Sequence, residues 1–211
     1  MTAQRVIVWR HGRTEWNATG RYQGQVDVPL DPLGQKQAAA AAEMIKELKP
    51  TKIISSDLTR AASTAQALAD LTGLPVSHDQ RLREINVGSW EGLTVEEARE
   101  ADPDLAAAVA AGIDARRSPT GELTSEVAAR VAEALGEVIE QADDGATVVV
   151  TMHGLAGRVG IAEFLGIEHT KLGGLRNCGW VILDRHHLGH WYIGAYNLQA
   201  AHSVPDDDRV A

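Results

Sequence analysis

Residues 6–12 read Val-Ile-Val-Trp-Arg-His-Gly, an apolar run that ends in two basic side chains and a glycine. The apolar run predicts a buried strand, and the glycine predicts a turn directly after it. In an open α/β sheet, the residues that follow a strand lie at the edge where ligands bind. Imidazole is a nucleophile at neutral pH, and a guanidinium binds phosphate oxygens through its planar fork. We therefore expect Arg10 and His11 to lie together in a phosphate-binding site.

Composition limits the classes of partner that the protein can bind. The 211 residues are 44% hydrophobic, which allows a substantial core and suits one α/β domain better than two. Lys and Arg number 20 against 29 Asp and Glu, so the formal net charge is −9, and the chain has no basic run. This balance argues against binding to nucleic acid or to an anionic membrane surface. An anionic substrate must therefore be bound by local arginines against an unfavourable overall field.

The single cysteine and the hydropathy pattern indicate a cellular compartment. Cys178 excludes an internal disulfide and has no C-x-x-C partner, so we expect a buried apolar side chain in a reducing environment. The N-terminal residues enter a strand without a secretory apolar core, and no later segment approaches membrane-spanning length. We expect a cytoplasmic protein that has no membrane partner.

Strand-like and helix-like stretches alternate along the chain. Apolar runs predict strands at residues 6–9, 52–55, 147–152, 179–183 and 191–196. Helix-forming composition, terminal signals and amphipathic spacing predict helices at residues 32–48, 59–71 and 125–141. Such alternation is typical of an α/β fold of three layers, an α/β/α sandwich with a mainly parallel central sheet.

We expect one domain over residues 1–204 and a flexible tail at residues 205–211. Within the domain, residues 94–121 are Ala-rich and then turn to Arg-Arg-Ser-Pro-Thr-Gly, which predicts a short helical excursion, followed by a loop, that serves as a lid. We expect core or sheet packing at three tryptophans, namely Trp90, Trp180 and Trp191. We expect an exposed hairpin turn, rather than a metal site, at His186, His187 and His190.

Polar side chains lie close after several of the predicted strands. Arg10 and His11 follow the first strand, Ser-Asp-Leu-Thr-Arg at residues 56–60 follows the second, and His153 follows the third. Glu84 follows a short Arg-Leu-Arg segment. The carboxyl ends of parallel strands meet at one edge of a sheet, so we expect two arginines, two histidines and one carboxylate to share that edge. This set is sufficient for phosphoryl transfer through a covalent intermediate.

Five separated motifs of the chain resemble the histidine phosphatase, or phosphoglycerate mutase-like, superfamily. In the family's order they are Val8-Trp9-Arg10-His11-Gly12 with Thr14 and Asn17, then Arg21-Tyr22-Gln23-Gly24, then Ser55-Ser56-Asp57-Leu58-x-Arg60-Ala61, then Leu82-Arg83-Glu84 with Gly88-x-Trp90-Glu91-Gly92, and His153-Gly154. Five motifs in order are much more specific than one. The resemblance implies a phosphoglycerate mutase-like fold.

The resemblance also implies a role for each matching residue. His11 becomes phosphorylated, and Glu84 is the proton donor. The phosphate pocket is formed by Arg10, Asn17, Gln23, Gly24, Arg60, His153 and Gly154. The scheme requires no metal and no cofactor, and its partner is a small phosphorylated substrate. A homodimer is suggested by the resemblance alone.

The physical chemistry agrees with these roles. His11 must be neutral at its attacking nitrogen, and its other ring nitrogen needs an acceptor, commonly a backbone carbonyl, to fix the tautomer. Nearby arginines lower the proton affinity of a histidine and neutralise the equatorial oxygens as the phosphoryl group moves. Without the resemblance, Glu84 would be interpreted as a solvated carboxylate. Asn17 and Gln23 depend almost wholly on the family pattern.

The preferred function is a metal-independent phosphomonoesterase that hydrolyses a sugar phosphate or a phosphoglycerate derivative through phosphohistidine. One alternative is a cofactor-dependent phosphoglycerate mutase, but the segment between Glu84 and His153 leaves little material for a lid that excludes water. Gln23-Gly24-Gln25 also resembles the phosphatase branches more than the mutases. An alternative of another class is a non-hydrolysing phosphohistidine carrier or phosphopeptide-binding module, which would not need Glu84.

The chain departs from the family pattern at three places. Arg13 stands where Glu or Gln is usual, so it either favours a multiply anionic substrate or forms a surface salt bridge. Leu123 stands where a Gly-Glu-Ser element has its serine, so no role is transferred to it. Arg116 and Arg117 resemble a paired arginine that binds the substrate carboxylate in true mutases. The sequence around them does not match, so we interpret both as loop charge.

Overall fold

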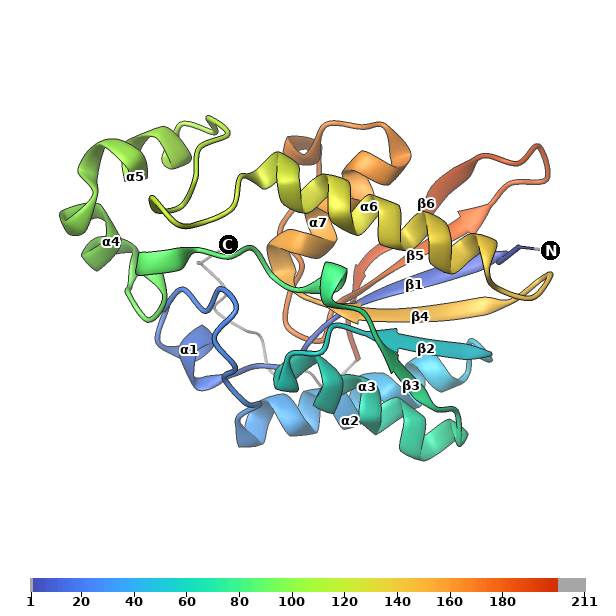
Figure 1. The fold of residues 1–211 in the computed structure, drawn as a ribbon. Coiled ribbons are helices and arrows are strands. Elements are labelled where there is room, and N and C mark those ends of the chain that lie inside the picture. The colour runs from blue at the N-terminus through green and yellow to red at the C-terminus, as the bar shows by residue number, and fades with distance from the viewer. Residues whose placement is uncertain (1, 201–211) are drawn as a thin grey trace.

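The computed structural model describes residues 2–200, in which six strands form one mixed sheet between layers of helices (Figure 1). The strands are β1 (Arg5–Arg10), β2 (Lys52–Ser55), β3 (Val76–His78), β4 (Thr147–Met152), β5 (Trp180–Arg185) and β6 (Trp191–Leu198). The helices are α1 (Glu15–Ala18), α2 (Pro32–Lys46), α3 (Thr59–Thr72), α4 (Val95–Ala101), α5 (Pro103–Ala110), α6 (Thr124–Glu140) and α7 (Gly154–Leu165). Three short 3-10 helices are η1 (Gln80–Leu82), η2 (Gly88–Trp90) and η3 (His169–Lys171).

The strand order is β3-β2-β4-β1-β5-β6, which places β1 and β4 at the centre of the sheet. The first four strands in this order pair in parallel, whereas β5 pairs antiparallel with β1 and β6 antiparallel with β5. The short connection between β5 and β6 explains the change of direction, because a hairpin can join only antiparallel strands. The expected mainly parallel sheet is confirmed, with an antiparallel hairpin at one edge.

Successive side chains of β1 pack on opposite faces of the sheet. Val6 and Val8 belong to an apolar cluster with residues of α6 and α7, and Ile7 and Trp9 belong to a second cluster with residues of α2 and α3. This alternation is the two-residue period of a strand, and a strand that is apolar on both faces must be covered on both. Figure 1 shows α2 and α3 below the sheet and α6 and α7 above it. The three-layer sandwich is confirmed.

Strand pairing carries three polar residues to one edge of the sheet. The backbone N–H of His11 donates to the carbonyl of Met152 at 3.0 Å, and the N–H of Ser56 donates to the carbonyl of Thr151 at 2.9 Å. The ladder therefore continues one residue past the ends of β1 and β2. His11, Ser56 and His153 leave neighbouring strands side by side.

Helix α7 was not among the helices predicted from periodicity. Its sequence lacks a polar face because it is buried against both the sheet and α6, and most of its first nine residues are inaccessible. Glycines allow this close approach, since a Cβ atom at Gly160 would lie 2.1 Å from Cγ1 of Val131 on α6. A helix that is apolar all round cannot be distinguished from a buried strand by periodicity alone.

Two other elements differ in detail from the expectation. The excursion at residues 94–121 contains two helices, α4 and α5, before its loop, and both lie at the end of the molecule where α1 lies (Figure 1). β3 was not predicted, because its three residues are partly or fully exposed at the sheet edge and show no apolar run. The tail expected at residues 205–211 lies outside the described residues.

The expected packing residues lie where the sequence placed them. Trp90, Trp180 and Cys178 are buried. Trp191 is partly buried and contacts Phe164 edge to face, with ring centroids 6.0 Å apart.

The histidine-rich segment lies between β5 and β6. His186, His187 and His190 occupy the turn between β5 and β6, where the N–H of His186 donates to the carbonyl of His190 at 2.8 Å. The hairpin turn is therefore confirmed. Within residues 2–200, no helix is both long enough and apolar enough to cross a bilayer.

We predict that Gly160→Ala lowers the free energy of unfolding by about 1–2 kcal/mol, because the new methyl group would overlap Val131 and overpacking exceeds the gain in helix propensity. Gly136→Ala on α6 is the matched control. A Cβ atom there meets nothing within 4 Å, so the same change should raise stability by about 0.5–1 kcal/mol. Urea unfolding of both variants measures the difference. A Gly160→Ala protein as stable as wild type would contradict the close α6–α7 packing.

Candidate active site

His11 lies directly after β1 with its ring fixed by the backbone. Its Nδ1 is 2.7 Å from the carbonyl oxygen of Gly12. A carbonyl can only accept, so Nδ1 carries the proton and Nε2 keeps its lone pair. Burial lowers the pKa of His11 well below its ordinary value, and the charges of Arg60 and Arg10 lower it further. The ring is therefore a neutral nucleophile with one defined tautomer.

The ring of His153, which follows β4, packs against the ring of His11. The two ring centroids are 5.1 Å apart at an interplanar angle of 61°. Nε of Arg60 lies 3.3 Å from Nδ1 of His153, and Nε2 of His153 lies 2.9 Å from Oγ of Ser56. Arginine can only donate, so His153 accepts at Nδ1 and holds its proton on Nε2. Burial lowers the pKa of His153 well below its ordinary value, followed by the charge of Arg60.

Arg60 is fully buried at the start of α3. Its terminal nitrogens donate to the carbonyls of Val26 and Gly24, both at 2.8 Å. Burial lowers its pKa to about 10, so the guanidinium stays charged at neutral pH. Gly24 presents its carbonyl from a left-handed conformation with φ +52°, and a Cβ atom there would lie 2.5 Å from Oε1 of Glu91. The glycine of this motif is therefore required by both backbone conformation and space.

Arg10 is the last residue of β1 and is 4% exposed. Its Nη1 donates to the carbonyl of Leu175. A Cβ atom at Gly154 would lie 3.3 Å from Nε of Arg10, so the glycine after His153 gives the guanidinium its room. The charges of Arg10, at the end of β1, and of Arg60, at the start of α3, converge on His11.

Asn17 and Gln23 present amide groups to the same space. Oδ1 of Asn17 accepts from the backbone N–H of Thr14 at 3.2 Å and from Nδ2 of Asn177 at 3.2 Å. The hydroxyl of Thr14 lies 3.0 Å from Oε1 of Gln23. These bonds occupy the amide oxygens, so the N–H groups of both amides remain to face an anion. Both side chains belong to the wall of the pocket that holds His11.

Glu84 lies on the wall of the same pocket, against the start of α7. Its Oε1 accepts from the N–H of Ala156 at 2.9 Å, and its Oε2 accepts from the N–H of Leu155 at 3.2 Å. Backbone N–H groups in the first turn of a helix have no partner within the helix, so α7 supplies donors that fit a carboxylate. The side chain is thus held against α7, whose first residue also contacts Arg10.

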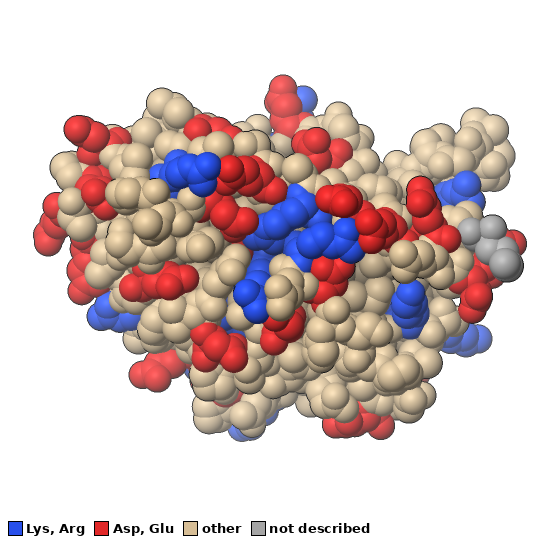
Figure 2. All heavy atoms as spheres, in the orientation of Figure 1, with Lys and Arg blue, Asp and Glu red and all other residues tan. Residues whose placement is uncertain are grey.

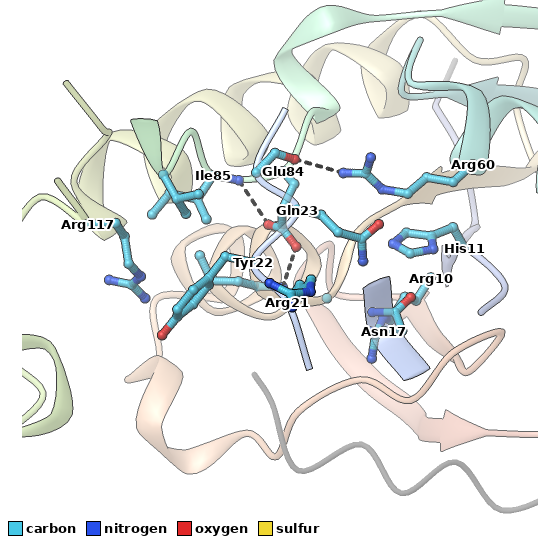
Figure 3. Close-up of a pocket in the computed structure, with 14 residues that line it drawn as sticks. Arg10, His11, Asn17, Arg21, Tyr22, Gln23, Arg60, Glu84, Ile85 and Arg117 are labelled. Atoms are coloured by element: carbon cyan, nitrogen blue, oxygen red, sulfur yellow. Dashed lines mark hydrogen bonds between the residues drawn. The ribbon is translucent and has the colours of Figure 1, made fainter. Parts of the chain in front are cut away.

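The two ends of the pocket are lined by different side chains. It encloses about 640 Å³, part of it open solvent, and its wall contains Arg10, His11, Asn17, Arg21, Tyr22, Gln23, Gly24, Arg60, Glu84, Ile85, Val87, Arg117, Gly154 and Leu155. Figure 3 shows His11 and Arg60 at one end and Arg117 with Tyr22 at the other, with Glu84 between them. All predicted pocket residues except His153 lie on this wall. The His153 ring is fully buried and touches the pocket only through Arg60 and His11.

Of the three arginines at the sequence departures, Arg117 lies in the pocket wall, whereas Arg13 and Arg116 do not. Nε of Arg13 donates to Asp31 at 2.7 Å, so its role as a salt bridge is the one observed. Arg116 is exposed and pairs with Glu126 at 2.8 Å, as loop charge should. For Arg117 the loop-charge interpretation was wrong, because its guanidinium lies in the pocket wall and burial lowers its pKa. These two adjacent side chains differ in direction, which the sequence does not reveal.

Comparison with known proteins identifies the family. The family model of the histidine phosphatase superfamily (branch 1) matches residues 6–199. The chain belongs to the histidine phosphatase superfamily. A glucosyl-3-phosphoglycerate phosphatase of Mycolicibacterium vanbaalenii is 42% identical over 206 residues, which cover 93% of this chain and 91% of the relative. A probable phosphoglycerate mutase of Erwinia tasmaniensis is 33% identical and covers 94% of this chain and 93% of the relative.

Solved structures of histidine phosphatases share the fold. A mycobacterial glucosyl-3-phosphoglycerate phosphatase in complex with VO3 has a TM-score of 0.84 at 35% identity, covering 93% of this chain and 100% of that one. A phosphoserine phosphatase from Entamoeba histolytica in complex with 3-phosphoglyceric acid has a TM-score of 0.83 at 31% identity, covering 95% and 99%. The phosphoglycerate mutase-like fold is confirmed, and so is the expectation of a phosphatase for small phosphorylated metabolites.

We predict that this histidine phosphatase loses stability as the pH falls below about 6.5, the ordinary histidine pKa. His11 and His153 have lowered pKa values in the native state, so below that pH the unfolded chain binds protons that the native state does not. The free energy of unfolding should fall by as much as about 1.4 kcal/mol per pH unit for each histidine.

Urea unfolding between pH 7.5 and pH 5 measures this slope. His11→Asn and His153→Asn should each remove about half of it, whatever their effect on stability at pH 7.5. A wild-type stability that does not change over this range would show that folding does not lower the pKa values of the two histidines.

Proposed function

We propose that the protein hydrolyses a carboxylate-bearing phosphate monoester through a phosphohistidine formed on Nε2 of His11. The observation that carries the proposal is the bond from Nδ1 of His11 to the Gly12 carbonyl, which leaves Nε2 as a lone-pair nucleophile beside two arginines. A cationic pocket around a neutral imidazole favours attack on an anionic phosphoryl group.

In the first step, the lone pair on Nε2 of His11 forms a bond to phosphorus, and the bond between phosphorus and the ester oxygen breaks. The electron pair leaves with that oxygen, which takes a proton from the carboxyl group of Glu84. Arg10 and Arg60 bind the equatorial oxygens, with the amide N–H groups of Asn17 and Gln23 beside them. The alcohol then leaves through the end of the pocket where Arg117 and Tyr22 lie.

In the second step, a water molecule gives a proton to the Glu84 carboxylate and attacks phosphorus. The bond between nitrogen and phosphorus breaks, its electron pair returns to Nε2, and inorganic phosphate leaves. Glu84 is again protonated, and the enzyme is regenerated. Every charge in the scheme is met by a side chain, so no step uses a metal ion. His153 orients Arg60 by accepting a hydrogen bond from its Nε.

Arg117 supports the choice of substrate class. Among residues 2–200, no carboxylate forms an ion pair with Arg117, whereas Arg116 and Arg21 are paired with Glu126 and Glu97. A partly desolvated guanidinium in a pocket wall is available for an anionic group of the substrate. One relative named above is a glucosyl-3-phosphoglycerate phosphatase, and the phosphoserine phosphatase was solved in complex with 3-phosphoglyceric acid, so both names include a compound that carries a phosphate ester and a carboxylate. A phosphoglycerate-type substrate fits both ends of the pocket.

Hydrolysis is favoured over mutase activity by how little of the predicted lid lines the pocket. Of residues 94–121, only Arg117 belongs to the pocket wall, and part of the pocket volume is open solvent. A mutase must exclude water while a phosphorylated intermediate turns over. Because one relative is a probable phosphoglycerate mutase, mutase activity is the alternative to be tested.

We predict that the purified protein releases phosphate from 3-phosphoglycerate and from glucosyl-3-phosphoglycerate in the presence of EDTA. With catalytic 2,3-bisphosphoglycerate present, phosphate release should exceed isomerisation of 3-phosphoglycerate. Reaction with radiolabelled substrate followed by rapid quenching should give an acid-labile, alkali-stable label on the protein.

His11→Gln should abolish both label and turnover, a loss of at least about 10⁴-fold, because the nucleophile is removed. His187→Gln, in the exposed hairpin turn, is the matched control and should retain both. Isomerisation faster than release would favour the mutase. A labelled His11→Gln protein would exclude His11 as the nucleophile.

We predict a substrate-dependent effect of Arg117→Ala. It should lower kcat/KM for 3-phosphoglycerate by about tenfold or more, since a hydrogen-bonded ion pair contributes about 1.5–3 kcal/mol. It should change kcat/KM for p-nitrophenyl phosphate, which has no carboxylate, by less than about threefold. Arg116→Ala removes the neighbouring charge outside the pocket and should change neither value. Equal losses on both substrates would place Arg117 in phosphate binding instead.

A further inference from the structure

The loop that carries Glu84 is bound by one side chain from outside the pocket. Arg130, on α6, directs its guanidinium at three main-chain carbonyls of this loop. Its Nη1 donates to the carbonyl of Arg81 at 2.6 Å and to that of Arg83 at 2.7 Å, and its Nη2 donates to the carbonyl of Glu84 at 3.1 Å. A planar guanidinium presents its donors in a fixed fork, so one side chain fixes the positions of all three carbonyls.

Glu122 fixes the guanidinium in turn. Its carboxylate accepts from Nε and Nη2 of Arg130, both at 3.0 Å, and its Oε2 also accepts from the backbone N–H of Asn86 at 2.7 Å. Glu122 and Arg130 therefore bind the loop from both sides of Glu84, one through carbonyls and the other through an N–H group. Neither side chain belongs to the pocket wall.

The carboxylate of Glu84 depends on this main-chain position. Its two oxygens accept from the N–H groups of Leu155 and Ala156 at the start of α7, at 3.2 Å and 2.9 Å. Hydrogen bonds of this length tolerate displacements of only a few tenths of an ångström. A shift of the Glu84 backbone would therefore move the carboxyl group away from α7 and from the leaving oxygen of a bound substrate.

Two other arginines of the same loop bind side chains instead of carbonyls. Nη2 of Arg81 pairs with Glu137 of α6 at 2.7 Å, and Nε of Arg83 pairs with Asp57 at 2.7 Å. The side chain of Arg130 is 18% exposed, against 33% for Arg81 and 31% for Arg83. Figure 2 shows that Lys and Arg on this face are bordered by Asp and Glu, in keeping with such pairs. Arg130 alone among these three reaches the backbone of Glu84.

We propose that Arg130 is a positioning residue for proton transfer: it holds the Glu84 loop so that the carboxyl group reaches the leaving oxygen of the substrate. The inference rests on the proposed role of Glu84 and adds that this role is set from α6, outside the pocket. A misplaced acid affects only substrates whose leaving group needs a proton. An alkoxide needs one, whereas 2,4-dinitrophenolate is stable enough to leave without it.

The test compares kcat/KM for 3-phosphoglycerate and for 2,4-dinitrophenyl phosphate, because kcat/KM includes the step in which the alcohol or phenol leaves. Arg130→Met should lower the value for 3-phosphoglycerate by about tenfold to hundredfold and the value for the dinitrophenyl ester by less than about threefold. Arg130→Lys keeps the charge and an N–H donor group but not the planar fork, so it should restore part of the loss. A general loss of structure would lower both values equally.

Arg81→Met is the matched control, because it removes an arginine that joins the same loop to α6 without binding a carbonyl. It should leave the ratio of the two values unchanged. Glu122→Gln is the milder second variant if Arg130→Met does not fold. It keeps the shape of the side chain while weakening its bond to Arg130, and it should change the ratio in the same direction by a smaller factor. Equal losses on both substrates in Arg130→Met and Glu122→Gln would overturn the inference.

Glu84→Gln separates this inference from the proposed function. If Glu84→Gln changes the ratio and the Arg130 and Glu122 variants do not, the positioning role fails while the proton donor stands. If Glu84→Gln leaves the ratio unchanged, the proposed role of Glu84 fails, and the positioning role fails with it.

Discussion

Parallel pairing of β1 with β4 is the constraint on which the site depends. It places the carboxyl ends of two central strands side by side, so that His11 and His153 emerge as neighbours although 142 positions separate them along the chain. The same pairing puts the N-terminus of α7 directly after β4, where its N–H groups reach Glu84. His11, His153 and Glu84 are thus brought together by one ladder and the helix that follows it.

Desolvated positive charge is the second feature of the site. In a chain with a formal net charge of −9, Arg60 is fully buried and Arg10 almost so. Burying a charge is unfavourable unless hydrogen bonds compensate, and backbone carbonyls provide such bonds to both guanidinium groups. Two buried guanidinium groups beside His11 suit the binding of a phosphate ester.

How far the sequence predicts the structure depends on whether the signal is local. The apolar run of β1, the proline at the start of α2 and the glycine that ends α3 are local signals, and the corresponding elements form within a few residues of their expected positions. α7 carries no such signal, because packing against both the sheet and α6 replaces its polar face with glycine and alanine. β3 gains its strand conformation from pairing at the sheet edge, which no three-residue stretch can encode.

The same distinction between local and tertiary signals applies to the site. By itself, the sequence determined the central strand, the layers and the kinds of side chain that line the pocket. The reason is that a strand apolar on both faces, and the motif residues that follow it, are local properties of the chain. Only the tertiary structure decided that Arg117 faces the pocket while Arg116 faces solvent, and that Arg130 reaches the carbonyls behind Glu84. The direction of a side chain in a loop, and its partners across a helix interface, are set by the packing of distant segments rather than by neighbours in sequence.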